Sequence, residues 1–173
     1  MPVTLRRTQK LARALPLTAA AAGESSTALG DWYANRLVVD RRPLLLLVSS
    51  RTLFPILLAA REVSSLPTRL AEIVGTRLRR AGIASRLIAA EVAAMDAVTV
   101  AKTTDRSVVG IMVDFAFATG HYRPIGGWDE TTLPFVEARL AETPCYASRC
   151  ESDVVHPDRD TPARLAEVWG AFS

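Results

Sequence analysis

The run Leu44-Leu45-Leu46-Leu47-Val48 restricts the fold more than any other feature of this chain. Five consecutive apolar residues without alternation predict a strand that is covered on both faces and lies inside a sheet. An aromatic and β-branched stretch from Trp32 to Val39 precedes it, and the polar cluster Asp40-Arg41-Arg42-Pro43 separates the two runs. We therefore expect an antiparallel hairpin with strands at 32–39 and 43–49.

Shorter signals predict the elements around this hairpin. Val3–Leu5 indicates an opening strand, Thr8–Leu15 one or two helical turns, and the Ala, Gly and Ser residues of Thr18–Thr27 a loop. Thr52–Leu58 is apolar and contains Pro55, and we expect a helical turn packed near the hairpin. The β-rich segment Val98–Thr103 predicts a strand that returns to the same sheet.

Apolar residues recur at helical spacing through most of the second half. We expect helices at 67–80, 84–95, 105–118 and 132–142, and a short terminal helix with Thr161 as its cap and Pro162 in its first turn. The helix at 105–118 is apolar on most sides and is expected to be the central core helix. These elements predict an α+β fold: a small, mainly antiparallel sheet built on a β-hairpin and packed against several α-helices.

Length and composition indicate a single domain over 1–173, with 145–173 as a peripheral C-terminal segment. Arg6, Arg7, Lys10 and Arg13 precede no long apolar stretch, so we expect neither a signal peptide nor a membrane span but a soluble, cytoplasmic protein. In that compartment Cys145 and Cys150 are expected to be ordinary thiols, because their spacing matches no common zinc pattern. No metal and no cofactor is predicted.

The strand-to-helix junction Lys102-Thr103-Thr104-Asp105-Arg106-Ser107 is the sharpest candidate for a site. Backbone N–H groups at a helix start, together with nearby Lys and Arg, suit a phosphate or carboxylate. Asp105 favours the structural alternative, a well-capped helix whose Arg106 pairs with Asp31 or Asp114. The ligand-binding hypothesis groups four side chains at one end of the sheet: Asp31, Asn35, Lys102 and Arg106. Asn35 belongs to it because an amide in an apolar strand must find partners or face a cavity.

Catalytic machinery is not evident in the sequence. His121 and His156 have no serine or cysteine partner nearby, and neither a Gly-x-Ser-x-Gly elbow nor a phosphate-binding Gly-rich loop occurs. Basic residues do cluster, near the N-terminus, at Arg41 and Arg42, and at Arg77, Arg79 and Arg80. Two such clusters on one side of the fold would form an electropositive face, but the formal net charge of only +3 leaves nucleic acid a less favoured partner.

Three segments carry a family resemblance: Leu29-Gly30-Asp31-Trp32-Tyr33-Ala34-Asn35, Arg51-Thr52-Leu53-Phe54, and Ala101-Lys102-Thr103-Thr104-Asp105-Arg106-Ser107-Val108-Val109-Gly110. Together they resemble a family of small bacterial proteins formed by a domain of unknown function, over roughly 3–145. The resemblance implies the domain boundary and no activity.

Our leading hypothesis is therefore a non-enzymatic binding or interaction module, with a bacterial operon or mobile-element system as its suggested setting. A protein partner or a small anionic ligand would be its target. The alternative is an enzyme or small-anion-binding protein that uses the four-residue pocket at the junction.

Overall fold

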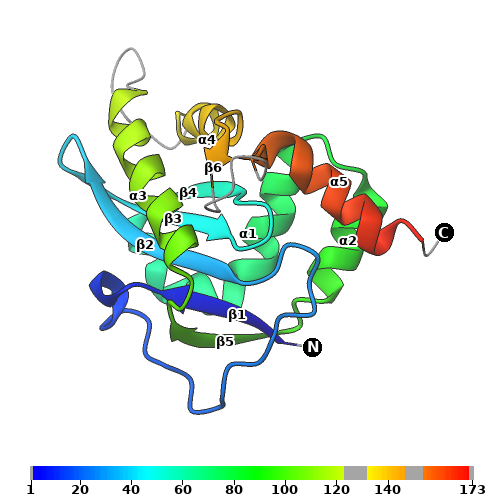
Figure 1. Cartoon of the computed structure of the whole chain (residues 1–173). Helices are drawn as coiled ribbons and strands as arrows, with labels where there is room; N and C mark the ends of the chain where they lie inside the picture. Colours follow the sequence, from blue (N-terminus) through cyan, green and yellow to red (C-terminus); the bar gives the residue numbers. More distant parts are fainter. Residues whose placement is uncertain (1, 123–131, 147–153, 172–173) are drawn as a thin grey trace.

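The computed structural model describes residues 2–122, 132–146 and 154–171, and one five-stranded sheet organises them (Figure 1). Its strands are β1 (Pro2–Arg7), β2 (Trp32–Val39), β3 (Arg42–Ser49), β4 (Pro55–Ala59) and β5 (Ala97–Lys102), in the spatial order β4-β3-β2-β1-β5. β3 pairs antiparallel with both β2 and β4. The leucine-rich strand therefore lies inside the sheet, as its lack of alternation predicted.

The α+β class and the hairpin are confirmed. The parallel pairing of β1 was not predicted from the sequence. β1 pairs parallel with β2 on one side and with β5 on the other. Antiparallel ladders still make up the larger part of the pairing. Because β1, β2 and β5 run in the same direction, their carboxyl ends point to the same end of the molecule.

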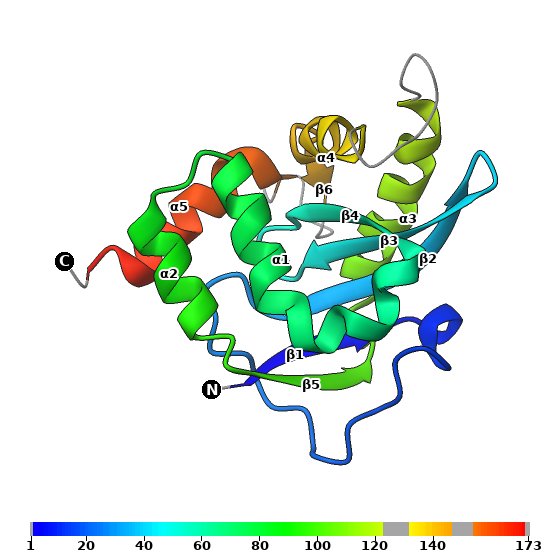
Figure 2. The ribbon, with the colours of Figure 1, turned by 180° about the vertical axis from the view of Figure 1, so that it is seen from behind.

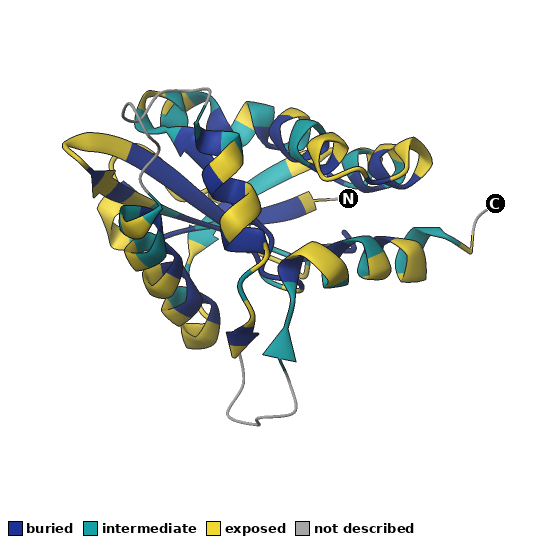
Figure 3. Ribbon diagram, turned by 90° about the horizontal axis from the view of Figure 1, so that it is seen from above, coloured by how far each residue is buried: buried dark blue, intermediate teal, exposed yellow. Residues whose placement is uncertain are grey.

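Helices cover both faces of the sheet (Figures 1 and 2). One face packs against α1 (Leu66–Arg80), α2 (Ser85–Ala93) and α5 (Pro157–Trp169), and the other against α3 (Arg106–His121) and α4 (Leu133–Ala141). Strand residues alternate between the two cores: Leu45 and Leu47 face the first, Leu44 and Leu46 the second. Burial colouring shows buried strands between helices whose outer sides are exposed (Figure 3).

Short elements complete the chain. Two 3-10 helices, η1 (Gln9–Leu11) and η2 (Ala60–Ser65), follow β1 and β4, and β6 (Cys145–Tyr146) pairs with β7 (Val154–Val155). The long β1–β2 connection contains η1, and its remainder is without helix or strand. It runs along the outer edge of β5, where the Thr18 N–H donates to the Val100 carbonyl (3.0 Å) and the Val100 N–H to Thr18 Oγ1 (2.8 Å). These bonds occupy an otherwise open sheet edge.

Two predicted helical starts are wrong. The segment Thr52–Leu58 contains no helical turn but most of strand β4, because a short apolar run has no periodicity to separate helix from strand and pairing with β3 decides. The terminal helix begins at Pro157, not at Thr161. Pro157 occupies the first turn, and Pro162 lies inside the helix.

The helix expected at the centre of the core is instead a surface helix. One side of α3 packs on β2 and β3, with Met112 and Phe115 buried. Val113 and Phe117 lie on its other side and are 60% and 72% exposed. A helix that is apolar on most sides is predicted to be buried on all of them, because no row of polar residues marks the side that faces solvent. For α3 this pattern predicts more burial than the structure has.

The C-terminal segment contributes to the core, because Leu165 of α5 is fully buried. No helix within the described ranges is long and apolar enough to cross a bilayer.

Candidate functional site

The junction between β5 and α3 is held to the sheet by Tyr33. The backbone N–H of Asp105 donates to the Tyr33 hydroxyl (3.0 Å), which also lies 3.3 Å from Thr104 Oγ1. Asp105 in turn caps α3, accepting bonds from the Ser107 N–H (2.9 Å) and hydroxyl (2.6 Å). These bonds lower the pKa of the Asp105 carboxyl, the Ser107 side chain being the main cause. The predicted cap is therefore present.

Arg6, not Arg106, completes this corner. Its Nε lies 2.5 Å from Asp31 Oδ2, and its Nη1 donates to the Lys102 carbonyl (2.9 Å). Ser25 donates its hydroxyl to the other oxygen of Asp31 (2.5 Å). Both charged side chains of the pair are mostly buried. Of the two partners suggested for Arg106, Asp31 is taken by this bridge, because Arg6 lies opposite Tyr33 in the β1–β2 register.

A polar cavity of about 390 Å³ opens beside this bridge. Its lining includes the hydroxyls of Ser25, Ser50, Tyr33 and Thr104. Two cations, Arg6 and Arg51, face three acids, Glu24, Asp31 and Asp105. Since Arg6 is already paired with Asp31, the charge of the lining does not favour an anion. The cavity suits a small polar molecule with both donors and acceptors.

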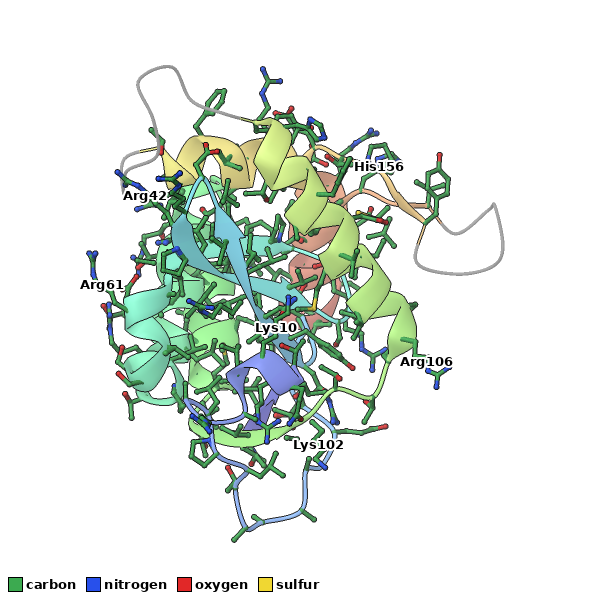
Figure 4. All side chains as sticks on the ribbon, turned by 90° about the vertical axis from the view of Figure 1, so that its left-hand side faces the viewer. Lys10, Arg42, Arg61, Lys102, Arg106 and His156 are labelled. Atoms are coloured by element: carbon green, nitrogen blue, oxygen red, sulfur yellow. The ribbon has the colours of Figure 1, made fainter. Side chains whose placement is uncertain are left out.

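The four side chains predicted as one site do not converge. Asp31 lines the cavity, whereas Asn35 accepts a hydrogen bond from the Thr8 hydroxyl (2.7 Å) and one from the Arg36 N–H (2.9 Å). Lys102 and Arg106 are exposed and lie apart on the end of the molecule that Figure 4 faces. Arg6 is at the centre of this corner, and the only signal it gives in the sequence is its membership of the N-terminal basic cluster.

The end of the molecule that faces the viewer in Figure 4 carries residues of the N-terminal and Arg41–Arg42 clusters together with Lys102 and Arg106. We call it the basic end, because the carboxyl ends of the three parallel strands lie there, and the labelled cations Lys10, Arg42, Lys102 and Arg106 are spread across it. It is defined by seven exposed side chains: Lys10, Arg13, Arg36, Arg41, Arg42, Lys102 and Arg106. The clusters were visible in the sequence, but their meeting depends on β1 pairing parallel with both β2 and β5.

A second cavity, of about 420 Å³, lies near the edge of β4. Four arginines line it, but ion pairs offset much of their charge. Arg69 contacts Glu62 (3.2 Å) and Glu72 (3.3 Å), and Arg77 contacts Glu137 (2.9 Å). Set against Glu62, Glu72 and Glu137, the four arginines leave a formal excess of only one positive charge at this cavity.

The described cysteine and histidine side chains show no arrangement typical of a nucleophile or of a metal site. Burial, with a smaller contribution from Asp114, raises the pKa of the Cys145 thiol to about 11, so the thiol is protonated at neutral pH. Cys150 lies outside the described residues. His121 stacks edge-on against Phe117, and His156 precedes α5. Across the described ranges, no cluster of three His, Cys, Asp or Glu side chains could hold a metal ion.

Fold and surface together define an α+β protein whose five-stranded sheet packs against helices on both faces and has a basic surface at one end. The family comparison agrees with the sequence resemblance: the model of the Domain of unknown function (DUF6933) matches residues 4–160, and the chain belongs to this family. The match ends within α5. No curated protein and no solved structure matches the chain.

Proposed function

We propose that the protein is a non-enzymatic binding module and that its basic end takes an anionic partner. The observation that carries this proposal is a charge asymmetry that follows from the topology. The segments 7–13, 36–42 and 102–106, at the carboxyl ends of β1, β2 and β5, contain eight basic and two acidic residues. Their formal charge is +6, whereas that of the whole chain is +3, so the rest of the chain is negative.

The basic end is exposed, which is what long-range attraction of an anion requires. Among the eight basic residues only Arg7 is buried, and its Nε donates to the Leu15 carbonyl (2.8 Å). Of the two acids, Asp105 is engaged in capping α3. β4 has the same direction as β2, and the residues after it, Arg61 and Glu62, add no net charge. The excess of formal positive charge in these three segments is therefore our reason for placing the anion at the ends of the parallel strands.

The location also fits a general property of sheets with parallel strands. Ligands of open α/β sheets bind outside the carboxyl ends of the strands, where loops are free to vary without disturbing the core. Here β1 lies between two parallel neighbours, and the seven cations of the basic end lie in the loops that follow β1, β2 and β5 or in the elements that flank those loops.

The alternative function uses the polar cavity beside Arg6 and Asp31. Its hydroxyl lining supports binding of a small polar molecule. Its excess of acids over cations does not support a small anion, and its described lining holds neither a histidine nor a cysteine. The cavity is therefore the weaker basis for a function.

Retention on a heparin column during a rising salt gradient tests the proposal, because heparin is a soluble polyanion and its binding weakens with salt. We expect the wild-type chain to elute well above physiological salt. Lys10→Gln/Lys102→Gln/Arg106→Gln should elute at clearly lower salt.

The matched control is Arg79→Gln/Arg86→Gln/Arg159→Gln, which removes the same charge from exposed helical positions outside the basic end. It should elute close to the wild type. Elution of the wild type without retention, or equal loss in both triple variants, would contradict a localised binding surface.

A further inference from the structure

The end of the β2–β3 hairpin protrudes from the body of the molecule (Figures 1 and 2). We call residues 36–43 the hairpin arm. Its exposed residues are Arg36, Val38, Asp40, Arg41, Arg42 and Pro43. Leu37 and Val39 are instead buried in the core that carries α3, and they hold one side of the arm to the molecule as far as the turn. The arm is thus a two-stranded ribbon with three arginines, anchored at one side and open on the other.

The turn of the arm has an unusual residue for its geometry. Val39 pairs with Arg42, so Asp40 and Arg41 form a two-residue turn, and both have positive φ, 49° and 66°. This is the pattern of a type I′ hairpin turn, which prefers Asn-Gly or Asp-Gly. Asp40 fits the preference, but Arg41 holds a left-handed conformation that disfavours a side chain. Because the turn would form better with glycine, the arginine at the tip points to a role other than folding.

The chemistry of the arm favours one class of anion. A two-stranded ribbon fits the major groove of B-form DNA, and Arg guanidinium groups bond bidentately to phosphates and to guanine edges. Segments 7–13, 36–43 and 102–106 contain no aromatic residue that could stack on an unpaired base. The major groove of A-form RNA is too deep and narrow for such a ribbon. Double-helical DNA is therefore the polyanion that these residues match.

We propose that the hairpin arm enters the major groove of double-helical DNA while Lys10, Arg13, Lys102 and Arg106 contact the phosphates beside it. This inference rests on the proposed function, since it names the partner of the basic end. It assigns different roles to the two groups of cations. The phosphate contacts set the salt dependence of binding. The arm adds affinity for a DNA duplex that it does not add for heparin, because heparin has no major groove.

Fluorescence anisotropy with a labelled 24-base-pair DNA duplex tests these roles. The double variant Lys102→Gln/Arg106→Gln removes two of the proposed phosphate contacts. It should therefore reduce the slope of log affinity against log salt by about two. Arg41→Gly should lower duplex affinity about tenfold, the loss expected for one arginine contact. It should not lower the melting temperature, because Asp-Gly suits the turn. The variant thereby separates binding from folding.

Comparison of probes separates this inference from the proposed function. On heparin, Arg41→Gly should lose as much as Arg13→Gln, because each variant removes one cation of the basic end, whereas on the duplex Arg41→Gly should lose clearly more than Arg13→Gln. The control Arg79→Gln/Arg86→Gln should bind the duplex as the wild type does.

If the chain binds heparin but Arg41→Gly leaves duplex affinity unchanged, the groove assignment is wrong and the proposed function stands. Tighter binding of single-stranded DNA or of double-stranded RNA than of the duplex would also overturn the assignment. No retention on heparin would remove both proposals.

Discussion

Arg77 of α1 and Glu137 of α4 meet across the free edge of β4, with 2.9 Å between Nε and Oε1. Between them they bind both backbone polar groups of one residue, Leu57, on the outer edge of β4. The Leu57 N–H donates to Glu137 Oε1 (2.7 Å), and Arg77 Nη2 donates to the Leu57 carbonyl (3.3 Å). Pro55, two residues earlier, has no N–H to offer. The pair and the proline close a sheet edge that would otherwise be open to another strand.

Removal of one member of this pair should be costly. Arg77→Met leaves the Glu137 carboxylate without its cation at a site that is nearly buried, and we expect a loss of about 3 kcal/mol in the free energy of unfolding. Arg77→Met/Glu137→Gln should lose less, because the glutamine oxygen still accepts from the Leu57 N–H. Urea denaturation measures both. An equal or larger loss in the double variant would show that charge is not the cause.

The same pair predicts a pH dependence. Burial raises the pKa of the Glu137 carboxyl, and Arg77 opposes that shift. A carboxyl whose pKa is higher in the folded than in the unfolded state binds its proton more tightly when folded. Its contribution to stability therefore falls as the pH rises from the unfolded-state pKa to the folded-state pKa. Without Arg77 the pKa should rise further. The deficit of Arg77→Met should therefore be smaller at about pH 4 than at about pH 7, and equal deficits would argue against this account.

Glu91 joins three separated segments with one buried carboxylate. It accepts from the N–H groups of Ala28 (2.8 Å) and Leu29 (3.0 Å) and from the Trp169 indole (2.7 Å). Glu91→Ala leaves three donors without this acceptor and should cost about 3 kcal/mol or more. Trp169→Phe removes one of these bonds along with the indole and should cost about 1–2 kcal/mol. Chemical denaturation measures both losses, and a smaller loss for Glu91→Ala than for Trp169→Phe would refute the triple role.

Gly30 and Gly82 form a matched pair, since both have positive φ, 77° and 78°. A Cβ on Gly30 would lie 2.4 Å from Ser50 Oγ and 2.8 Å from Arg51 Cγ, whereas a Cβ on Gly82 would have no neighbouring atom within 4 Å. Gly82→Ala should therefore cost about 1 kcal/mol for backbone conformation alone. Gly30→Ala should cost clearly more and shift Asp31 beside it. Thermal unfolding of the two variants checks this order, and the reverse order would contradict it.

Asp105 predicts an acid-side effect. Asp105→Ala removes the cap of α3 and should cost about 1 kcal/mol. Because its pKa is lowered in the folded state, the carboxylate contributes stability above the unfolded pKa and loses it as pH falls. Asp105→Asn keeps a capping oxygen without this titration. Urea denaturation of wild type and Asp105→Asn should differ most near neutral pH and converge in acid, and a constant difference would count against the titration.

Local pattern predicted much of this fold. The unalternating leucines placed β3 inside the sheet, and helical spacing located α1, α2 and α4 closely. It failed at Thr52–Leu58, where a short apolar run suits helix or strand alike. It also failed for the outer side of α3, because apolar residues there are not covered by any described element. For the site, pattern found the Asp105 cap, but it offered Arg106 either Asp31 or Asp114 and did not show that Asp31 pairs with Arg6.

The chain's own residue order is enough to specify the hairpin, the helix caps and the existence of separate basic clusters, since each depends on neighbours a few positions apart. The Arg6–Asp31 bridge, the closed edge at Leu57 and the meeting of cations on one end join residues tens of positions apart. They exist because β1 pairs parallel with β2 and β5 and because helices pack on both faces. Strand order and register are set by the free energy of burying two whole cores, which no short segment contains.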